Sequence, residues 1–539
     1  MLTVSATSHA FDEEVEHQVM SDAENQVHDV GVFESTVLRL AKAGFSEKAA
    51  LTTALVQLRD PGSRRVLLAL LESQLHVDNQ TGRILIVNDS KEGLQYTDAI
   101  TGNALDGPDF DSKRILTNNP LRKKLRGDIA RFDLTNDDED VRRAAVVQLR
   151  RDIDQDIAAI FREHQSVEKN DDVIDEIQTA LAIFDLQSED PDVRIRALEI
   201  LDGEVANDVF NAVKQLLNSE EDKEVRRAAE SAIQTIESKR RFYGALETFF
   251  FGLSFGSVLV LAAIGLAITF GVMGVINMAH GELIMLGAYT TFVMQQLLPN
   301  HIGLSIVLSI PAAFVVSGLV GIAIERGVVR FLYGRPLETL LATFGISLIL
   351  QQLVRTIFSP LNRSVQTPEM MSGLLRFNDI FAITYNRLYI LIFTLVVFAG
   401  LWLILNKTSL GLRVRAVSQN RQMARAMGVR TARVDAMTFG LGSGVAGIAG
   451  VALSQLTNVG PNLGQAYIID SFMVVVFGGV GNLWGTLVGG MILGVATKFM
   501  EPHVGAVMAK ILMLVFIILF IQRRKQGLFP QKGRAASGA

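Results

Sequence analysis

Three side chains that can do chemistry stand close together in an otherwise apolar stretch. Asn277, His280 and Glu282 fall within six positions of the run IGLAITFGVMGVINMAHGELIMLGAYTTF at 264–292. An amide, an imidazole and a carboxylate could hydrogen-bond a polar solute, or the last two could ligate a metal ion. Polar and ionisable groups at membrane depth are costly unless they are paired or face water, so the cluster indicates a functional site.

One unbroken helix cannot present these three groups together. On such a helix Asn277 and His280 lie about 60° apart, whereas Glu282 points about 160° away from His280. We therefore expect a break near Gly281. Asn277 and His280 would end one segment, and Glu282 would open the next. Structural roles are the alternative to substrate contact: His280 could cap a helix, and Glu282 could cap the next helix or pair with Arg355.

Charge divides the chain into two dissimilar parts. Of its 539 residues 20% are charged, yet the mean hydropathy is positive at +0.30, so a soluble part and a membrane part are joined. Residues 1–240 hold 29 Lys and Arg against 47 Asp and Glu, and the remainder holds 22 against 9. The sequence contains no cysteine, which excludes disulfides and thiolate chemistry. At 1–30 we expect a disordered tail or the remnant of a signal peptide, where Ser8 and Ala10 suit a cleavage site.

The acidic part, residues 31–240, has the pattern of a soluble, mainly helical domain. We expect it outside the cytoplasm, because three crossings separate it from the basic residue Arg326. Helices are predicted at 33–43, at 45–58 and after Asp60-Pro61, with short strands at GRILIV and LQYTDAI. A capped pattern recurs in DDEDVRRAAVVQL, SEDPDVRIRALEIL and SEEDKEVRRAAESAI at 137–149, 188–201 and 219–233. The unequal intervals from Val141 to Val193 and from Val193 to Val225 bracket a HEAT-like unit of two helices, which would offer a surface to a protein partner. Acidic faces that are merely solvated are the alternative.

Apolar runs of spanning length recur in the second half. A helical span needs about 20 residues, and candidates lie at 246–270, 282–298, 304–325, 338–358, 388–405, 435–456 and 506–521, with a longer run at 468–500. Because basic residues gather at 326–335, 407–433 and 523–525, these three stretches should be cytoplasmic. Stretches on the same side of the membrane are separated by an even number of crossings. The spans at 435–456 and 506–521 already supply two crossings between the last two basic stretches. The run at 468–500 is therefore expected to form a re-entrant hairpin that turns at FGGVGNLWG. The total is eight or nine membrane segments.

A basic stretch at 408–437 should contain a short amphipathic helix. Ala416, Met423, Ala424 and Met427 recur at helical intervals beside arginines, and Gly428 ends the pattern. One interpretation is a membrane-surface helix that holds anionic lipid.

The run GVMGVINMAHGELIMLGAY at 271–289 resembles the branched-chain amino acid permease family of ABC importers, in which Asn, two residues and His-Gly-Glu follow a glycine-rich span. The similarity continues through TLLATFGISLIL at 339–350 and FGGVGNLWGTLVGG at 477–490, and it covers residues 245–525. The HEAT-like front domain is similar to that of urea importers within this family, whereas the plain amino acid permeases lack it. The fold class expected is therefore all-α: a polytopic helical membrane permease preceded by a soluble HEAT-like domain and followed by a cytoplasmic tail at 526–539.

The resemblance implies a transport subunit, not an enzyme, that imports urea by alternating access. Its partners would be a second permease subunit, two cytoplasmic ATPases that dock on the basic stretch, a periplasmic urea-binding protein and membrane lipid. No nucleic acid, cofactor or metal is expected, because the chain lacks a Walker A motif and a second ligand cluster. The location would be a bacterial inner membrane, with the C-terminus cytoplasmic. A branched-chain or other amino acid permease, a passive urea channel and an intramembrane metallohydrolase are the alternatives.

These expectations select three groups of residues. They are Thr269, Asn277, His280, Gly281 and Glu282 for the substrate pathway or gate; Arg415, Ala416, Asn420, Arg421, Ala424, Met427 and Gly428 for ATPase docking; and Asp470, Gly478, Gly479, Gly481 and Asn482 for the hairpin.

Overall fold

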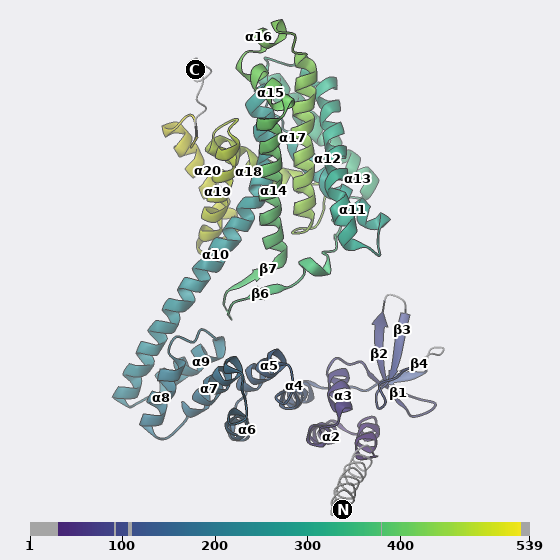
Figure 1. Ribbon diagram of the computed structural model, residues 1–539, viewed down its shortest axis with the longest axis vertical. Coiled ribbons are helices and arrows are strands. Elements are labelled where there is room, and N and C mark those ends of the chain that lie inside the picture. The colour runs from purple at the N-terminus through teal and green to yellow at the C-terminus, as the bar shows by residue number, and fades with distance from the viewer. Residues whose placement is uncertain (1–30, 91–92, 106–109, 379, 530–539) are drawn as a thin grey trace, which may run out of the picture. The chain divides into compact units, whose positions relative to one another are not determined.

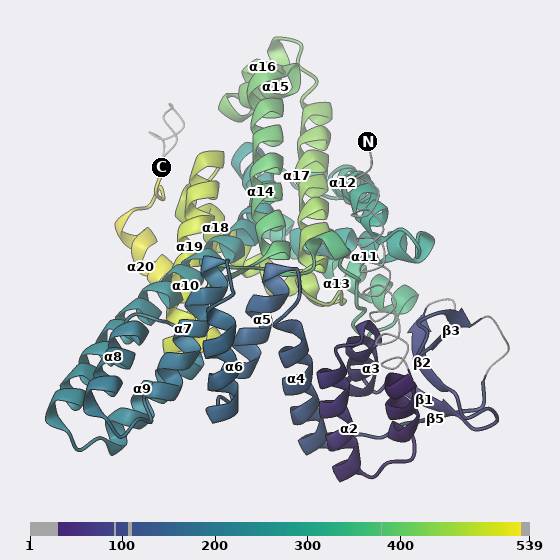
Figure 2. The ribbon, with the colours of Figure 1, turned by 60° about the horizontal axis from the view of Figure 1, so that its bottom comes forward.

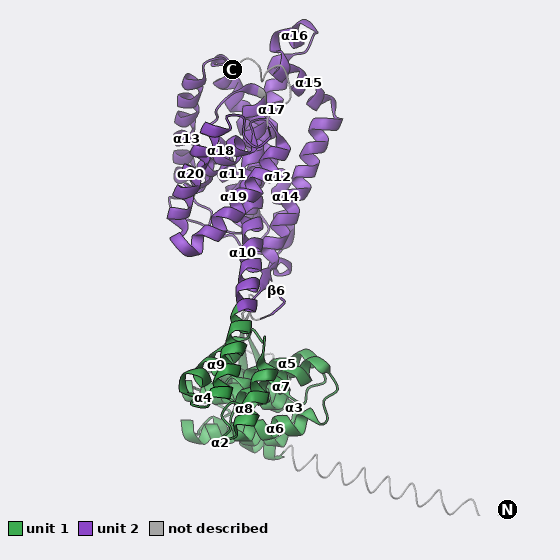
Figure 3. Ribbon diagram, turned by 90° about the vertical axis from the view of Figure 1, so that its left-hand side faces the viewer, with its two compact units in different colours: residues 1–237 green, residues 238–539 purple. Residues whose placement is uncertain are grey.

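A computed structural model describes residues 31–90, 93–105, 110–378 and 380–529 (Figure 1). The chain divides into two compact units, Met1–Glu237 and Ser238–Ala539 (Figure 3). This boundary lies beside the basic residues 239–241, close to where the charge balance changes sign. The segment 1–30 and the last ten residues of the tail lie outside the described residues.

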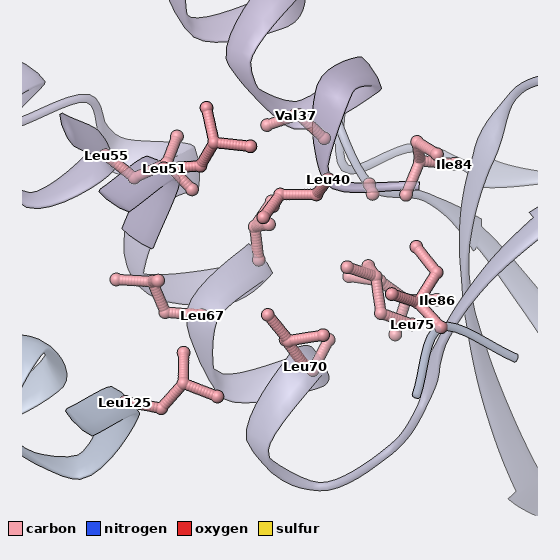
Figure 4. Packing of buried hydrophobic residues seen from close by; sticks show 14 of the residues in the cluster. Val37, Leu40, Leu51, Leu55, Leu67, Leu70, Leu75, Ile84, Ile86 and Leu125 are labelled. Atoms are coloured by element: carbon pink, nitrogen blue, oxygen red, sulfur yellow. The ribbon is translucent and has the colours of Figure 1, made fainter. Parts of the chain in front are cut away.

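The first unit begins with helices packed on a small antiparallel sheet. The predicted helices are confirmed as α2, Phe45–Leu58, and α3, Pro61–Leu71, with Asp60 accepting a 2.7 Å hydrogen bond from the Gly62 N–H at the start of α3. Leucines of α2 and α3 pack against Leu75 and Ile84 of the sheet (Figure 4). The strand order is β4-β3-β2-β1-β5, in which the bounds are β1 Leu75–Asp78, β2 Ile84–Ser90, β3 Gly93–Asp98, β4 Ala104–Leu105 and β5 Ser112–Arg114.

The two predicted strands are confirmed as β2 and β3, which pair antiparallel with Leu85 opposite Asp98. The sequence did not indicate β1, β4 or β5, because their short, mixed-polarity segments lack a run of alternating apolar residues. The unit therefore combines helices with one sheet, within a chain that is helical for most of its described length.

A repeat of three helices fills the rest of the first unit. Helix α4, Asn119–Asp133, recurs as α7, Asp171–Asp185, and each is capped by an asparagine side chain. Between and after them lie α5 Glu139–Arg150, α6 Gln155–Gln165, α8 Pro191–Leu201 and α9 Asn207–Ser219. The two-helix unit that the spacing suggested is therefore wrong, because the third copy of the capped pattern opens α10 at Lys223, where a helix equivalent to α4 and α7 begins.

A partly buried ion pair marks the same position in both copies of this repeat. Arg142 binds Glu168 at 2.8 Å, and Arg194 binds Glu220 at 2.9 Å at the equivalent place in the second copy. In both copies the arginine also donates to two carbonyl oxygens of the preceding turn. The Arg142 guanidinium holds the pKa of Glu168 at about 2, so this pair stays charged at neutral pH and keeps its hydrogen-bond geometry.

The second unit is a bundle of long apolar helices. Seven helices of the described chain are long and apolar enough to cross a membrane, and α18 is a shorter apolar helix. The helices are α10 Lys223–Met273, α11 His280–Leu297, α12 Ile302–Gly327, α13 Pro336–Phe358, α14 Tyr385–Lys407, α15 Ser409–Gln419, α16 Arg421–Ala426, α17 Thr431–Ser454, α18 Leu463–Gly478, α19 Leu483–Val504 and α20 Ala506–Arg523. The expected span at 282–298 corresponds to α11, which is not among the seven, since polar groups at both ends lower the hydropathy of its 18 residues.

Two sets of four helices make matching contacts in this bundle. In the first set, α10–α13, helix α12 packs on α17, where the backbone at Gly318 approaches Gly440. In the second set, α17–α20, helix α19 packs on α10, where Gly494 approaches Gly256. Glycines allow both approaches because a Cβ at either position would crowd the neighbouring backbone. The two sets thus make corresponding contacts, which is the pattern that internal structural repeats produce.

Helices α14–α16 lie between the two sets in the sequence. Helix α14 carries α15 and α16 after its C-terminal end (Figures 1 and 2). At its other end it follows a two-stranded ribbon of β6, Leu374–Arg376, and β7, Ala382–Thr384. The ribbon and the short helices α15 and α16 therefore lie at opposite ends of the bundle.

Candidate functional site

The polar stretch at 277–282 interrupts the helical path between α10 and α11. Helix α10 ends at Met273, and Gly274 follows with φ +65°, a left-handed conformation that favours glycine. The Asn277 side chain then accepts a 3.0 Å hydrogen bond from the Ala279 N–H, which holds the turn before α11. The expected break is therefore present but lies at 274–279, before His280, not near Gly281. His280 opens α11 together with Glu282 and does not end the preceding segment.

After this break the chain turns back along α10. His280 donates from Nε2 to the Ala262 carbonyl oxygen of α10 at 2.9 Å, and its ring is fully buried. A Cβ on Gly265 would lie 2.9 Å from the His280 ring, so glycine leaves the space that the imidazole occupies. Thr269, by contrast, hydrogen-bonds within α10 to the Leu266 carbonyl at 3.1 Å. It does not join the polar cluster.

Glu282 gathers hydrogen-bond donors from two other helices. Its Oε1 accepts from Ser347 Oγ at 3.0 Å and from Gln351 Nε2 at 2.8 Å, both on α13. It also accepts from Gln465 Nε2 on α18 at 2.9 Å. The alternative pairing with Arg355 is wrong, because that guanidinium donates to Asn462 Oδ1 at 2.8 Å. One buried carboxylate oxygen thus ties α11, α13 and α18 together.

The N-terminal ends of α11 and α18 meet beside this carboxylate. A Cβ on Gly281 would lie 2.5 Å from the Gly464 carbonyl oxygen, and a Cβ on Gly464 would likewise overlap the Gly281 backbone. Only glycine at both positions permits this approach. Because helix N-termini carry partial positive charge, the junction is a favourable place for the Glu282 carboxylate.

Three polar atoms at this junction have no partner in the described part of the chain. They are Nδ2 of Asn277, Nδ1 of His280 and Oε2 of Glu282, and all three residues are fully buried. A buried polar atom without a partner costs about 1–3 kcal/mol. The junction can therefore gain by hydrogen-bonding a small polar solute. Within the described residues no group of three or more His, Asp and Glu side chains is arranged to hold a metal ion.

The expected turn at FGGVGNLWG is confirmed between α18 and α19. Asn482 caps α19 by accepting from the Gly485 N–H at 3.1 Å, and Gly479 and Gly481 take φ +107° and +78°. Gly478 lies against Gly485 across the turn, so the two helices touch through their backbones.

Asp470, which the sequence assigns to the hairpin, takes no part in its turn. It lies inside α18, is buried, and binds Lys510 Nζ of α20 at 2.9 Å. An isolated carboxylate at this depth would be costly, and the lysine offsets that cost. The sequence did not indicate this pairing because Lys510 lies on a different helix, far along the chain from Asp470.

The basic stretch forms two short helices, where one was expected. Asn420 ends α15 and caps α16, accepting from the Met423 N–H at 2.9 Å, and Gly428 terminates α16 with φ +83°. Ala424 is buried, whereas Met423 and Met427 are 60% and 77% exposed. Ala416 is half-buried in α15, and the exposed Arg415 donates to the Leu405 carbonyl at 2.7 Å. Helix α16 thus presents methionines outward between arginines.

Arg421 connects α16 to the ends of α12 and α17. Its guanidinium lies 4.3 Å from the Tyr333 ring centroid and forms an ion pair with the buried Asp435 of α17. The Tyr333 hydroxyl donates to Glu325 of α12 at 3.1 Å. Burial and the carboxylates of Asp435 and Glu325 raise the pKa of Tyr333, so its hydroxyl remains a donor. A movement of α16 would therefore act on two long helices through one side chain.

Several partners of the candidate residues were not predicted. Ser347 and Gln351 belong to a polar stripe of α13 in which every fourth residue is polar and buried, and this spacing was a usable signal. No comparable sequence signal marks Gln465 and Gly464, since α18 approaches α11 only in the folded bundle. The stripe consists of Thr339, Thr343, Ser347 and Gln351.

A family model described as the permease component of branched-chain amino acid transport systems matches residues 248–521. The chain belongs to this family. The matched residues lie in the second unit and include both sets of helices and the α11–α18 junction. The permease is therefore a multi-pass membrane protein in which residues 248–521, from within α10 to near the end of α20, form the family part.

Known relatives resemble about half of this permease. The high-affinity branched-chain amino acid transport system permease protein BraD of Pseudomonas aeruginosa is 30% identical over 296 residues, which are 53% of this chain and 96% of that protein. LivH of Escherichia coli, described in the same words, is 30% identical over 291 residues, 52% of this chain and 94% of LivH. The ribose import permease protein RbsC of Bacillus subtilis is 35% identical over 104 residues, 18% of this chain and 32% of RbsC. No solved structure matches the chain.

Proposed function

We propose that this permease is the membrane subunit of an ATP-driven importer of urea. The observation that carries the proposal is the α11–α18 junction, where Glu282 is surrounded by amide and hydroxyl donors from Ser347, Gln351 and Gln465. Urea is small, neutral and rich in hydrogen-bonding groups, so it needs partners of this kind and no fixed cation. The acidic front unit, which adds 1–237 to the family part, supports the same choice through its resemblance to urea importers.

A branched-chain amino acid is the second candidate substrate. BraD and LivH are named for transport of these amino acids, and each aligns over nearly its whole length. Such a substrate would need a cation for its carboxylate and an apolar pocket for its side chain. The side chains that contact Glu282 supply neither.

In this proposal the α11–α18 junction is the gate of an alternating-access cycle. Two discontinuous helices that meet end to end at an internal-repeat interface are typical of transporter sites. Gly281 and Gly464 would separate when the gate opens, which would free Glu282 and Gln465 to contact substrate. Asn277 and His280 would hold the other side of the opening, with Thr269 further along α10.

The basic ends of the bundle set the proposed orientation. Arginines of α15, α16 and the C-terminal end of α20 would face the cytoplasm. The ribbon β6–β7 and the front unit would then face the periplasm, where a urea-binding protein would deliver substrate. A second permease subunit and two ATPases would complete the complex in a bacterial inner membrane.

Helix α16 is the proposed docking element for an ATPase. The exposed side chain of Met427 should insert into an apolar pocket of that partner, because exposed methionines adapt to a partner surface. We expect Met427→Asp to lower substrate-driven ATP hydrolysis and co-purification of the ATPase at least tenfold, whereas Met427→Leu should retain both. Unchanged co-purification of the Met427→Asp complex would contradict docking through α16.

Uptake of labelled solutes tests the proposed substrate. A strain that lacks this chain and is complemented with it should regain ATP-dependent uptake of urea, while leucine uptake should not change. Uptake that persists without ATP would favour a channel. Recovery of leucine uptake alone would defeat urea as the substrate and favour the second candidate.

A further inference from the structure

An open hollow of about 310 Å³ lies at the end of α17 that faces away from α15 and α16. It is lined by Val365, Ser454, Gln455, Leu456, Thr457 and Asn458. Four of these six side chains are hydroxyls or amides, and none carries a charge. The hollow is separate from the Glu282 cluster, with which it shares no residue.

Two buried amide oxygens close to this place have no hydrogen-bond partner among the described residues. Gln455 is buried with 8% exposed, and its Oε1 has no hydrogen-bond partner in the described chain. Asn386 of α14 donates from Nδ2 to the Gln455 carbonyl oxygen at 2.6 Å, and its own Oδ1 also has no partner among the described residues. Because an acceptor pairs only with a donor, a solute that hydrogen-bonds to either oxygen must present N–H or O–H groups.

The lining contains no charged residue, and the charged neighbour Arg363 has contacts of its own. Arg363 pairs its backbone with Val459 next to the hollow, at 2.7 and 2.8 Å, yet its guanidinium donates to the Phe358 carbonyl and lies over the Phe292 ring. A carboxylate in the hollow would thus meet no cation from its lining, and an ammonium group would meet no carboxylate there. This selects a neutral solute.

We propose that this hollow is an entry subsite that binds a small, neutral amide through its N–H groups, with Gln455 as the principal acceptor. The inference rests on the proposed import of urea and adds a second binding place to it. A solute released on this side of the membrane would be held at Gln455 before it reaches the junction of α11 and α18. The subsite would therefore raise the capture of dilute solute and would leave the turnover of a saturated transporter unchanged.

Urea uptake by the assembled transporter tests the subsite. Gln455→Met keeps the length of the side chain but removes its acceptor, and we expect KM for urea to rise about three- to tenfold with an unchanged maximal rate, as for the loss of one hydrogen bond. Asn458→Ala, at the exposed rim, should raise KM by a smaller factor and is the variant least able to disturb folding. Gln352→Met is the matched control, because Gln352 is exposed on α13 outside the hollow, and its KM should equal that of the wild type.

Solute chemistry provides a second measurement on the unaltered protein. Formamide should compete with labelled urea, whereas tetramethylurea, which keeps the carbonyl but has no N–H, should not. Equal competition by both would overturn the subsite, as would an unchanged KM in Gln455→Met and Asn458→Ala. Either result leaves urea import standing if the wild type takes up urea. Absence of urea uptake by the wild type would overturn both proposals.

Discussion

Replacement of Gly281 by leucine is expected to reduce uptake below detection while the protein still reaches the membrane. A Cβ at this position would already lie 2.5 Å from the Gly464 carbonyl oxygen and 2.8 Å from its carbon. The longer side chain would push α11 away from α18 and separate Gln465 from Glu282. Uptake of labelled substrate, divided by the amount of permease in the membrane, measures the effect. Gly464→Leu should have the same result, because the contact is reciprocal.

Gly345→Leu is the matched control for this prediction. Gly345 also lies in a helix of the bundle, but a Cβ there would meet nothing within 4 Å. It should retain wild-type uptake, which separates a local clash from a general intolerance of leucine in place of helical glycine. Wild-type uptake by Gly281→Leu would show that the two helix ends do not need to touch.

The interruption at the polar cluster could be predicted from angles alone. Three polar side chains at helical positions that face different ways cannot share one surface, so a break had to exist. The predicted position of this break, near Gly281, was wrong because Gly274 and Asn277 form the turn. The prediction had relied on the His280-Gly281-Glu282 run. A side chain that hydrogen-bonds the backbone two residues on is a stronger turn signal than a glycine followed by a helix-forming residue.

Partners from distant segments could not be predicted in the same way. Gln465 lies 183 positions after Glu282, and Lys510 lies 40 after Asp470. Nothing local distinguishes these residues from polar groups that face water or a helix end. Polar positions repeated every four residues on α13 are the exception, because a buried stripe in an apolar helix must meet other polar groups.

The period of the front unit shows how spacing can mislead. The capped pattern recurs at two unequal intervals, a long one from Val141 to Val193 and a shorter one from Val193 to Val225, which suggested units of two helices. The equivalent ion pairs of Arg142 with Glu168 and of Arg194 with Glu220 establish the long interval as the true period. The shorter interval joins two helices that occupy different places within that period, since similar caps open helices of every kind.

Removal of the Glu282 carboxylate is expected to have the second large effect. In Glu282→Ala the donors of Ser347, Gln351 and Gln465 lose their shared acceptor, at a cost of about 1–3 kcal/mol for each buried donor left unpaired. Helices α11, α13 and α18 would no longer be held together at one point. We expect uptake to fall at least tenfold.

Glu282→Gln is the conservative counterpart, because its side-chain carbonyl oxygen can still accept from the same three donors. It should retain a measurable part of the uptake. The ratio of uptake by Glu282→Gln to uptake by Glu282→Ala then measures the effect of the hydrogen-bond acceptor. ATP hydrolysis by the assembled complex separates two explanations of a loss. If Glu282 acts at the gate, Glu282→Ala should keep basal hydrolysis per assembled complex but lose its stimulation by substrate. If the carboxylate only supports the fold, uptake will fall in proportion to the amount of assembled protein, and the role of the α11–α18 junction as a gate would be contradicted.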